Sequence, residues 1–125
     1  MKTYRFALTV IALIVSLWPT ATAQDATGRI LGIVTDATGA VVPSAHVTVM
    51  NTATALTRDT MTAEDGSYQV LSLPIGNYTV SVDRTGFRKT ITAPQQLNIN
   101  NALRLDVKLE VGATTDTVQV EAKPS

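Results

Sequence analysis

His46 is the only histidine of the chain and therefore the first candidate for acid–base chemistry. Ser44 is a candidate nucleophile beside it, because in an extended backbone both residues would point away from the face of Ala45. A catalytic triad also needs an acid that orients the imidazole, and the sequence around these residues supplies none. We therefore expect His46 to be an ordinary exposed strand residue.

The composition offers little for metal chemistry. There is no cysteine, which removes thiol catalysis and most zinc sites, and one histidine cannot complete a zinc ligand set. Four acidic residues invite a calcium site instead: Asp36, Asp59, Glu64 and Asp65. Calcium loops space their carboxylates regularly, as in D-x-D-x-D-G, and no such pattern occurs, whereas residues 36–39 and 65–66 have turn composition. We predict no catalytic residue, no metal and no cofactor.

Sugar binding usually depends on exposed aromatic faces backed by polar groups. After the N-terminal signal peptide described below, three aromatic residues remain, and strand alternation or a turn points each of them inward: Tyr68, Tyr78 and Phe87. A glycan is therefore a disfavoured partner, with weak binding by polar loops left open. Asn77-Tyr78-Thr79 matches a glycosylation sequon, but Asn after Gly is also common turn chemistry.

The segment 116–122 (DTVQVEA) is the most specific candidate for a binding segment, because it is short, has high β-propensity and begins with an acidic residue. Such a segment can add as an extra strand to the sheet edge of another protein, where backbone bonds give affinity and alternate side chains give selectivity. The residues assigned to this contact are Asp116, Thr117, Val118, Val120 and Ala122. In the alternative, Val118 and Val120 complete the sheet of the chain's own domain.

The elements that would position these residues are strands. Alternating apolar and polar residues, separated by Gly, Asp or Pro turns, predict them at residues 29–35, 45–50, 57–62, 68–70, 78–83, 88–92, 97–99 and 103–110. The last is the clearest, with Leu103, Leu105, Val107 and Leu109 facing inward. Beyond residue 23 the sequence shows no helical periodicity. The sequence thus predicts an all-β fold, a small antiparallel β-sandwich of about seven strands preceded by a signal-peptide helix.

The first 23 residues have the composition of a secretion signal. Lys2 and Arg5 precede the uncharged apolar run 6–18, and small residues lead to a cleavage point between Ala23 and Gln24. An apolar helix of this length covers about 20 Å, too little for a bilayer core of about 30 Å. We therefore divide the chain into a signal peptide (1–23), a short leader (24–27), a sandwich (28–111) and a flexible tail (112–125).

Removal of the signal leaves a slightly acidic chain. The whole chain has 10 basic and 10 acidic residues, and cleavage of the signal peptide removes the basic residues Lys2 and Arg5. No basic stripe remains for nucleic acid, and Gln24 is not the cysteine that a lipid-anchored lipoprotein requires. We expect an exported protein without a nucleic-acid partner.

Residues 27–110 resemble the carboxypeptidase regulatory-like domain, a transthyretin-type β-sandwich with a carbohydrate-binding-like fold. The resemblance rests on a D-G-x-Y turn followed by L-P-x-G-x-Y, which here supplies the structural turn and core residues Asp65, Gly66, Tyr68, Pro74, Gly76 and Tyr78. Further matches are Gly28-Arg29-Ile30, Gly32-Ile33-Val34, Val42-Pro43 and Gly86-Phe87. The pattern contains no catalytic residue, so the resemblance implies a chain that is not an enzyme.

A signal peptide, this domain and VGATTDTVQVEA together resemble the start of an Oar-like TonB-dependent outer-membrane receptor. The resemblance implies that residues 116–122 are a TonB box, gripped by TonB through β-strand addition. It implies a location in the periplasm or outer membrane of a Gram-negative bacterium, or outside the cell for a free-standing copy. The plug and barrel of such receptors are absent from this chain, so we expect a non-enzymatic interaction module that corresponds to the N-terminal domain of a truncated receptor. The alternative is a carbohydrate-binding accessory domain.

Overall fold

The structure is a computed structural model that describes residues 19, 26–113, 115 and 117–120. The expected signal peptide, its cleavage point between Ala23 and Gln24, and the tail residues Asp116 and Ala122 lie outside the described residues. In the part of the chain that is described, no helix is long and apolar enough to cross a membrane.

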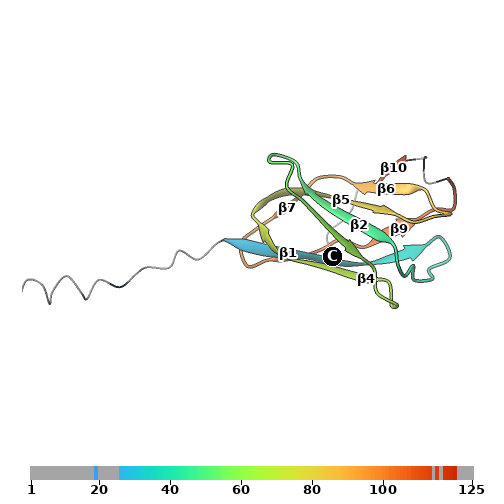
Figure 1. The fold of residues 1–125 in the computed structure, drawn as a ribbon, viewed down its shortest axis with the longest axis horizontal. Helices are drawn as coiled ribbons and strands as arrows, with labels where there is room; N and C mark the ends of the chain where they lie inside the picture. Colours follow the sequence, from blue (N-terminus) through green and yellow to red (C-terminus); the bar gives the residue numbers. More distant parts are fainter. Residues whose placement is uncertain (1–18, 20–25, 114, 116, 121–125) are drawn as a thin grey trace, which may run out of the picture.

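Two β-sheets pack face to face and enclose one core (Figure 1). The strands are β1 (Thr27–Asp36), β2 (His46–Asn51), β3 (Thr57–Met61), β4 (Ser67–Pro74), β5 (Gly76–Asp83), β6 (Lys89–Thr92), β7 (Gln95–Leu97), β8 (Ala102–Arg104), β9 (Val107–Leu109) and β10 (Thr117–Val120). In the first sheet β1 pairs with β4, β8 and β9. The second sheet has the order β10-β6-β5-β2-β3, and β7 also pairs with β5. The all-β sandwich predicted from the sequence is confirmed.

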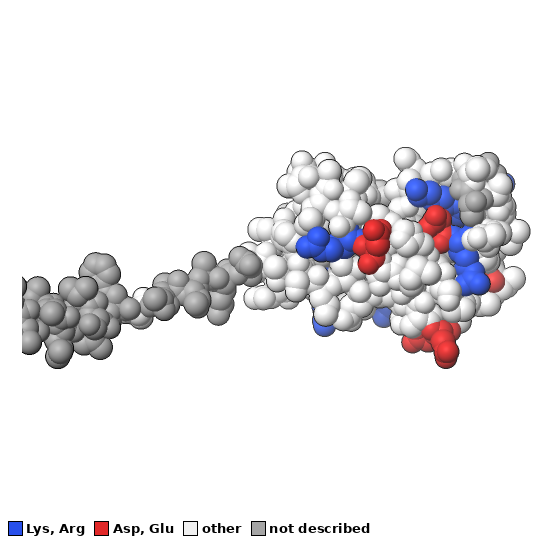
Figure 2. All heavy atoms as spheres, viewed as in Figure 1, with Lys and Arg blue, Asp and Glu red and all other residues white. Residues whose placement is uncertain are grey.

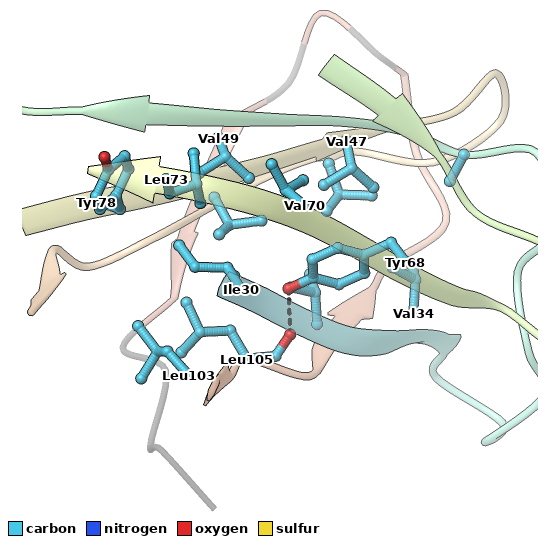
Figure 3. Packing of buried hydrophobic residues seen from close by; sticks show 14 of the residues in the cluster. Ile30, Val34, Val47, Val49, Tyr68, Val70, Leu73, Tyr78, Leu103 and Leu105 are labelled. Atoms are coloured by element: carbon cyan, nitrogen blue, oxygen red, sulfur yellow. Dashed lines mark hydrogen bonds between the residues drawn. The ribbon is translucent and has the colours of Figure 1, made fainter. Parts of the chain in front are cut away.

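The core follows the period of two seen in the sequence. Alternate residues of each long strand turn inward and meet between the sheets, as Figure 3 shows for side chains of both layers. The four inward positions predicted for residues 103–110 are all buried: Leu103, Leu105, Val107 and Leu109. Burial of one such side chain stabilises the fold by about 1.5–3 kcal/mol, which lets a domain without a disulfide hold together.

We expected antiparallel sheets, but both sheets are mixed. β8 and β9 run parallel to β1, and β10 runs parallel to β6. Alternation reports which face a side chain occupies, but it does not report strand direction. Direction depends on the connections, and β8 follows β7 of the other sheet, so the chain crosses between the sheets before it pairs with β1.

The strand predicted at residues 103–110 is divided into β8 and β9. This division is one reason that the described residues form more strands than the seven we expected. Both halves keep one register along β1, with Arg29 opposite Ala102 and Val34 opposite Val107. Between them the Asp106 carboxylate, instead of a backbone carbonyl, accepts the N–H of Ile33 at 2.9 Å. This side-chain acceptor interrupts the ladder without changing the inward face.

Two predicted boundaries also shift. Thr27, placed in the leader, is the first residue of β1. The strand expected at residues 97–99 lies instead at Gln95–Leu97, and Ile99 is exposed. A turn follows there, because Asn101 donates its N–H to the Asn98 carbonyl and Asn100 adopts a positive φ of 53°.

Candidate functional site

The structure brings two acids to His46 that lie far from it in the sequence. Its Nδ1 is 3.3 Å from Asp83 Oδ1 and its Nε2 is 3.4 Å from Asp59 Oδ1. Asp83 comes from β5 and Asp59 from β3, the two strands that flank β2. Sequence reasoning missed this cluster because it found no acid close to His46 along the chain. The available signal was that all three residues sit on outward positions of strands.

The His46 cluster does not have the geometry of a catalytic triad. A triad leaves one imidazole nitrogen free to face the nucleophile, whereas here a carboxylate oxygen lies beside each nitrogen. Ser44 does line the same open depression of about 480 Å³, together with Asp83 and Arg84, but no hydrogen bond joins it to His46 in the described structure. The side chains of His46, Asp59 and Asp83 are 47%, 58% and 41% exposed, so water screens the interactions between them. The cluster links three strands across the outer face.

The same geometry is unsuited to a metal ion. The two carboxylates approach opposite edges of the imidazole ring, so an ion at one nitrogen would have one of them as a partner. Among the residues that the structure describes, no group of three His, Cys, Asp or Glu side chains could hold a metal.

Two of the four acids considered for calcium, Asp36 and Asp65, form hydrogen bonds within their own turns. Asp36 Oδ1 accepts bonds from the N–H and the hydroxyl of Thr38, at 2.8 and 2.6 Å. The hydroxyl bond is the main reason that the pKa of Asp36 lies below its ordinary value. Ser67 bonds Asp65 in the same way and likewise lowers the pKa of that carboxyl. Gly66 completes the second turn with a φ of 75°.

The tyrosines of the family-like pattern point into the sandwich. Tyr68 is buried and donates its hydroxyl hydrogen to the Leu105 carbonyl, the contact drawn in Figure 3. Burial raises the pKa of Tyr68 above its ordinary range, and the charge of Asp106 adds to the rise. Tyr78 is buried too and donates to the Pro74 carbonyl at 2.6 Å, while Phe87 packs partly buried against the core. None of these rings forms an exposed platform for a sugar.

The backbone at the break between β8 and β9 depends on a glycine. A Cβ placed on Gly32 would lie 2.0 Å from the carbonyl oxygen of Leu105. This close approach positions the Leu105 carbonyl to accept the Tyr68 hydroxyl. Gly76 makes a second close approach, since a Cβ there would lie 2.7 Å from the Asn51 side-chain nitrogen. The turn and core residues singled out in the sequence therefore support packing.

The described part of the tail forms a strand of the domain's own sheet. β10 pairs in parallel with β6, with Thr117 opposite Lys89 and Val120 opposite Thr92. Thr117 and Gln119 are exposed and Val118 is half-buried. The alternative in which the tail completes the sheet is thus the one that residues 117–120 adopt. β10 is also the last strand of that sheet, so it has one edge on β6 and one edge without a partner among the described residues.

Charge on the surface is sparse and mixed. Figure 2 shows a few small groups of Lys, Arg, Asp and Glu side chains on one face, with wide uncharged areas between these groups. Among the ion pairs of the described residues, Arg104 Nε lies 3.2 Å from Asp106 Oδ2. This face therefore has no broad basic field of the kind that attracts a phosphate backbone.

A family model decides the assignment of the fold. The model of the carboxypeptidase regulatory-like domain matches residues 29–110, more than half of the chain. The chain belongs to this family. The resemblance drawn from the D-G-x-Y and L-P-x-G-x-Y patterns is therefore confirmed, and this regulatory-like domain supports the role of an interaction module.

Solved structures show the same fold at low sequence identity. The Bacillus anthracis TIE protein aligns with a TM-score of 0.59 and 19% identity over 69% of this chain and 17% of its own. A streptococcal ancillary pilin aligns with a TM-score of 0.55 and 15% identity over 72% of this chain and 34% of its own. Hydroxyquinol 1,2-dioxygenase from Pseudomonas putida DLL-E4 aligns with a TM-score of 0.57 and 11% identity over 74% and 59%.

These neighbours are all longer proteins, of which the regulatory-like domain matches 17% to 59%. At such identities the likeness concerns the fold. No curated protein matches the sequence significantly.

Proposed function

We propose that this regulatory-like domain is a non-enzymatic docking module that presents residues 116–122 to the energy-transducing protein TonB. The partner would bind by β-strand addition, in which backbone hydrogen bonds give affinity and alternate side chains give selectivity. The protein would be exported to the periplasm or outer membrane of a Gram-negative bacterium. A plug and barrel outside this chain would complete the receptor that such a module serves.

The observation that carries the proposal is the position of β10. It is the terminal strand of the six-stranded sheet, and Thr117 and Gln119 are exposed on it. A partner can therefore reach the backbone of this segment without opening the core. The His46 cluster supports the non-catalytic part of the proposal, because both imidazole nitrogens already face carboxylates.

The test is a titration of isotope-labelled TonB C-terminal domain with a peptide of residues 112–125. We expect saturable chemical-shift changes along one edge of the TonB sheet. A peptide of the same composition in scrambled order is the matched control, since it keeps the charge and removes the alternation. Absence of any shift at about 1 mM peptide, which corresponds to binding weaker than about 4 kcal/mol, would end the proposal.

A carbohydrate-binding accessory domain is the second candidate. The open depression lined by Ser44, His46, Asp83, Arg84 and Thr85 is polar enough to hydrogen-bond a sugar. Its described lining contains no aromatic ring, which such sites usually need, and this favours docking over sugar binding. Retardation of the exported chain in a polysaccharide affinity gel, lost on Arg84→Ala, would reverse this ranking.

A further inference from the structure

The edges of the two sheets differ in how well they are protected against another strand. Natural proteins block sheet edges with charges, prolines, bulges or very short strands. β3 carries Arg58 and Asp59, and β4 has a register shift along β1 and ends at Pro74. β8 and β9 are three residues each and carry Arg104 and Lys108. Each of these edges has at least one blocking feature.

β10 has four residues, one more than β8 or β9, and it carries none of the charged, proline or bulge features within its own span. Its sequence Thr-Val-Gln-Val contains no charge and no proline, and its pairing with β6 is regular over all four residues. Strands that expose their backbone in this way are templates for a further strand. Within its described residues, the outer edge of β10 therefore carries no charge, proline or bulge that would block a further strand.

The start of the tail is anchored beside the residues that precede β6. Val111 forms a bridge with Phe87, and Gly112 donates its N–H to the Gly86 carbonyl at 3.1 Å. The Arg88 side chain lies over Gly112, since a Cβ on that glycine would come within 2.5 Å of it. Val111 and Gly112 are therefore fixed close to the start of β6.

From these observations we infer that a partner strand adds to the free edge of β10 while β10 stays paired with β6. The sheet would then continue from β6 through β10 into the partner. This inference rests on the proposed function and specifies how the same segment is used. Displacement of β10 would break its ladder with β6 and expose a new edge, whereas addition keeps that ladder and uses a strand that is already ordered.

A reversible cross-link between β10 and β6 tests the inference. Gln119 lies opposite Ile91, and the chain has no cysteine of its own, so Ile91→Cys with Gln119→Cys places one pair across neighbouring strands. The exported chain, residues 24–125, carries both changes. Mass spectrometry reports the oxidation state, and calorimetric titration with the TonB C-terminal domain reports the affinity.

We expect the oxidised and reduced forms to bind TonB with affinities that differ by less than about threefold. The Ile91→Ser and Gln119→Ser double variant controls for loss of the two native side chains. A loss of about tenfold or more on oxidation, restored by reduction, would overturn the inference and leave the proposed function standing. If neither form nor the free peptide binds, the proposed function falls and the inference falls with it.

Discussion

The segments 102–109 and 117–120 have similar sequence patterns but different positions in the structure. Each alternates apolar and polar residues, and each pairs in parallel with an earlier strand. β8 and β9 lie on β1 and bury Leu103, Val107 and Leu109 under the opposite sheet. β10 lies at the end of a sheet and keeps Val118 only half-buried. A period of two therefore predicts a strand, but the surface that faces the strand decides whether it is core or edge.

The energies of the two segments should differ accordingly. Each buried leucine contributes about 1.5–3 kcal/mol, and residues 102–109 bury three leucines. β10 offers one half-buried valine and one short ladder. Segments with few buried contacts contribute little to the free energy of unfolding, and binding segments are drawn from them. We expect the first segment to hold the fold and the second to be available to a partner.

The largest expected effect comes from Leu105, which is fully buried in the break between β8 and β9. Leu105→Asp would bury an unpaired carboxylate and should lower the free energy of unfolding by at least about 3 kcal/mol. Val118→Asp on β10 is the matched control and should cost less than about 1 kcal/mol. Urea unfolding measures both. If the acidic variant of Leu105 fails to fold, Leu105→Ala should still lose about 2–5 kcal/mol. Equal losses at the two sites would contradict the comparison.

The next effect concerns Tyr68, whose hydroxyl bonds the Leu105 carbonyl. Tyr68→Phe should cost about 1–2 kcal/mol at neutral pH, because the buried carbonyl loses its donor. The pKa of Tyr68 is raised above its ordinary value of 10.0, so the folded state favours the neutral phenol. Its contribution is complete below pH 10 and is lost as pH rises further, by up to about 1.4 kcal/mol per pH unit.

Urea unfolding at about pH 8 and about pH 11 separates this contribution from other titrations. The native chain should lose more stability between these two values than Tyr68→Phe does. The same slope in both chains would mean that Tyr68 ionises as easily in the folded domain as in the unfolded chain.

The smallest expected effect is that of removing β10. A chain that ends after Gly112 keeps the Val111–Phe87 bridge and every residue of the buried core. Its free energy of unfolding should therefore lie within about 1 kcal/mol of the full chain. Thermal unfolding with a calorimetric readout measures the difference. A loss of about 3 kcal/mol or more would place β10 with β8 and β9 as a structural strand.

Much of the fold was predictable because burial follows side-chain alternation. Val47, Val49, Val80 and Val82 face inward as their spacing indicates, and Thr57–Met61 is an edge strand as its polar composition suggests. The polar inward side of β6 was harder to foresee. Thr90 and Thr92 are buried there, and the Thr92 hydroxyl accepts the Val80 N–H at 2.9 Å.

The candidate site was less predictable, because it depends on which strands become neighbours. His46 meets Asp59 and Asp83 only because β3 and β5 flank β2. The split between β8 and β9 likewise depends on Asp106 reaching the Ile33 N–H, a contact between residues far apart in the chain. No local pattern contains either contact.

The amino-acid order of this protein was enough to establish its strands, its inward-facing residues and its family pattern, since all three depend on near neighbours along the chain. Strand direction, the acids beside His46 and the place of residues 117–120 at a sheet edge came from packing. These features depend on how connections cross between the two sheets and on which backbone groups remain to pair, and both are settled when distant segments meet.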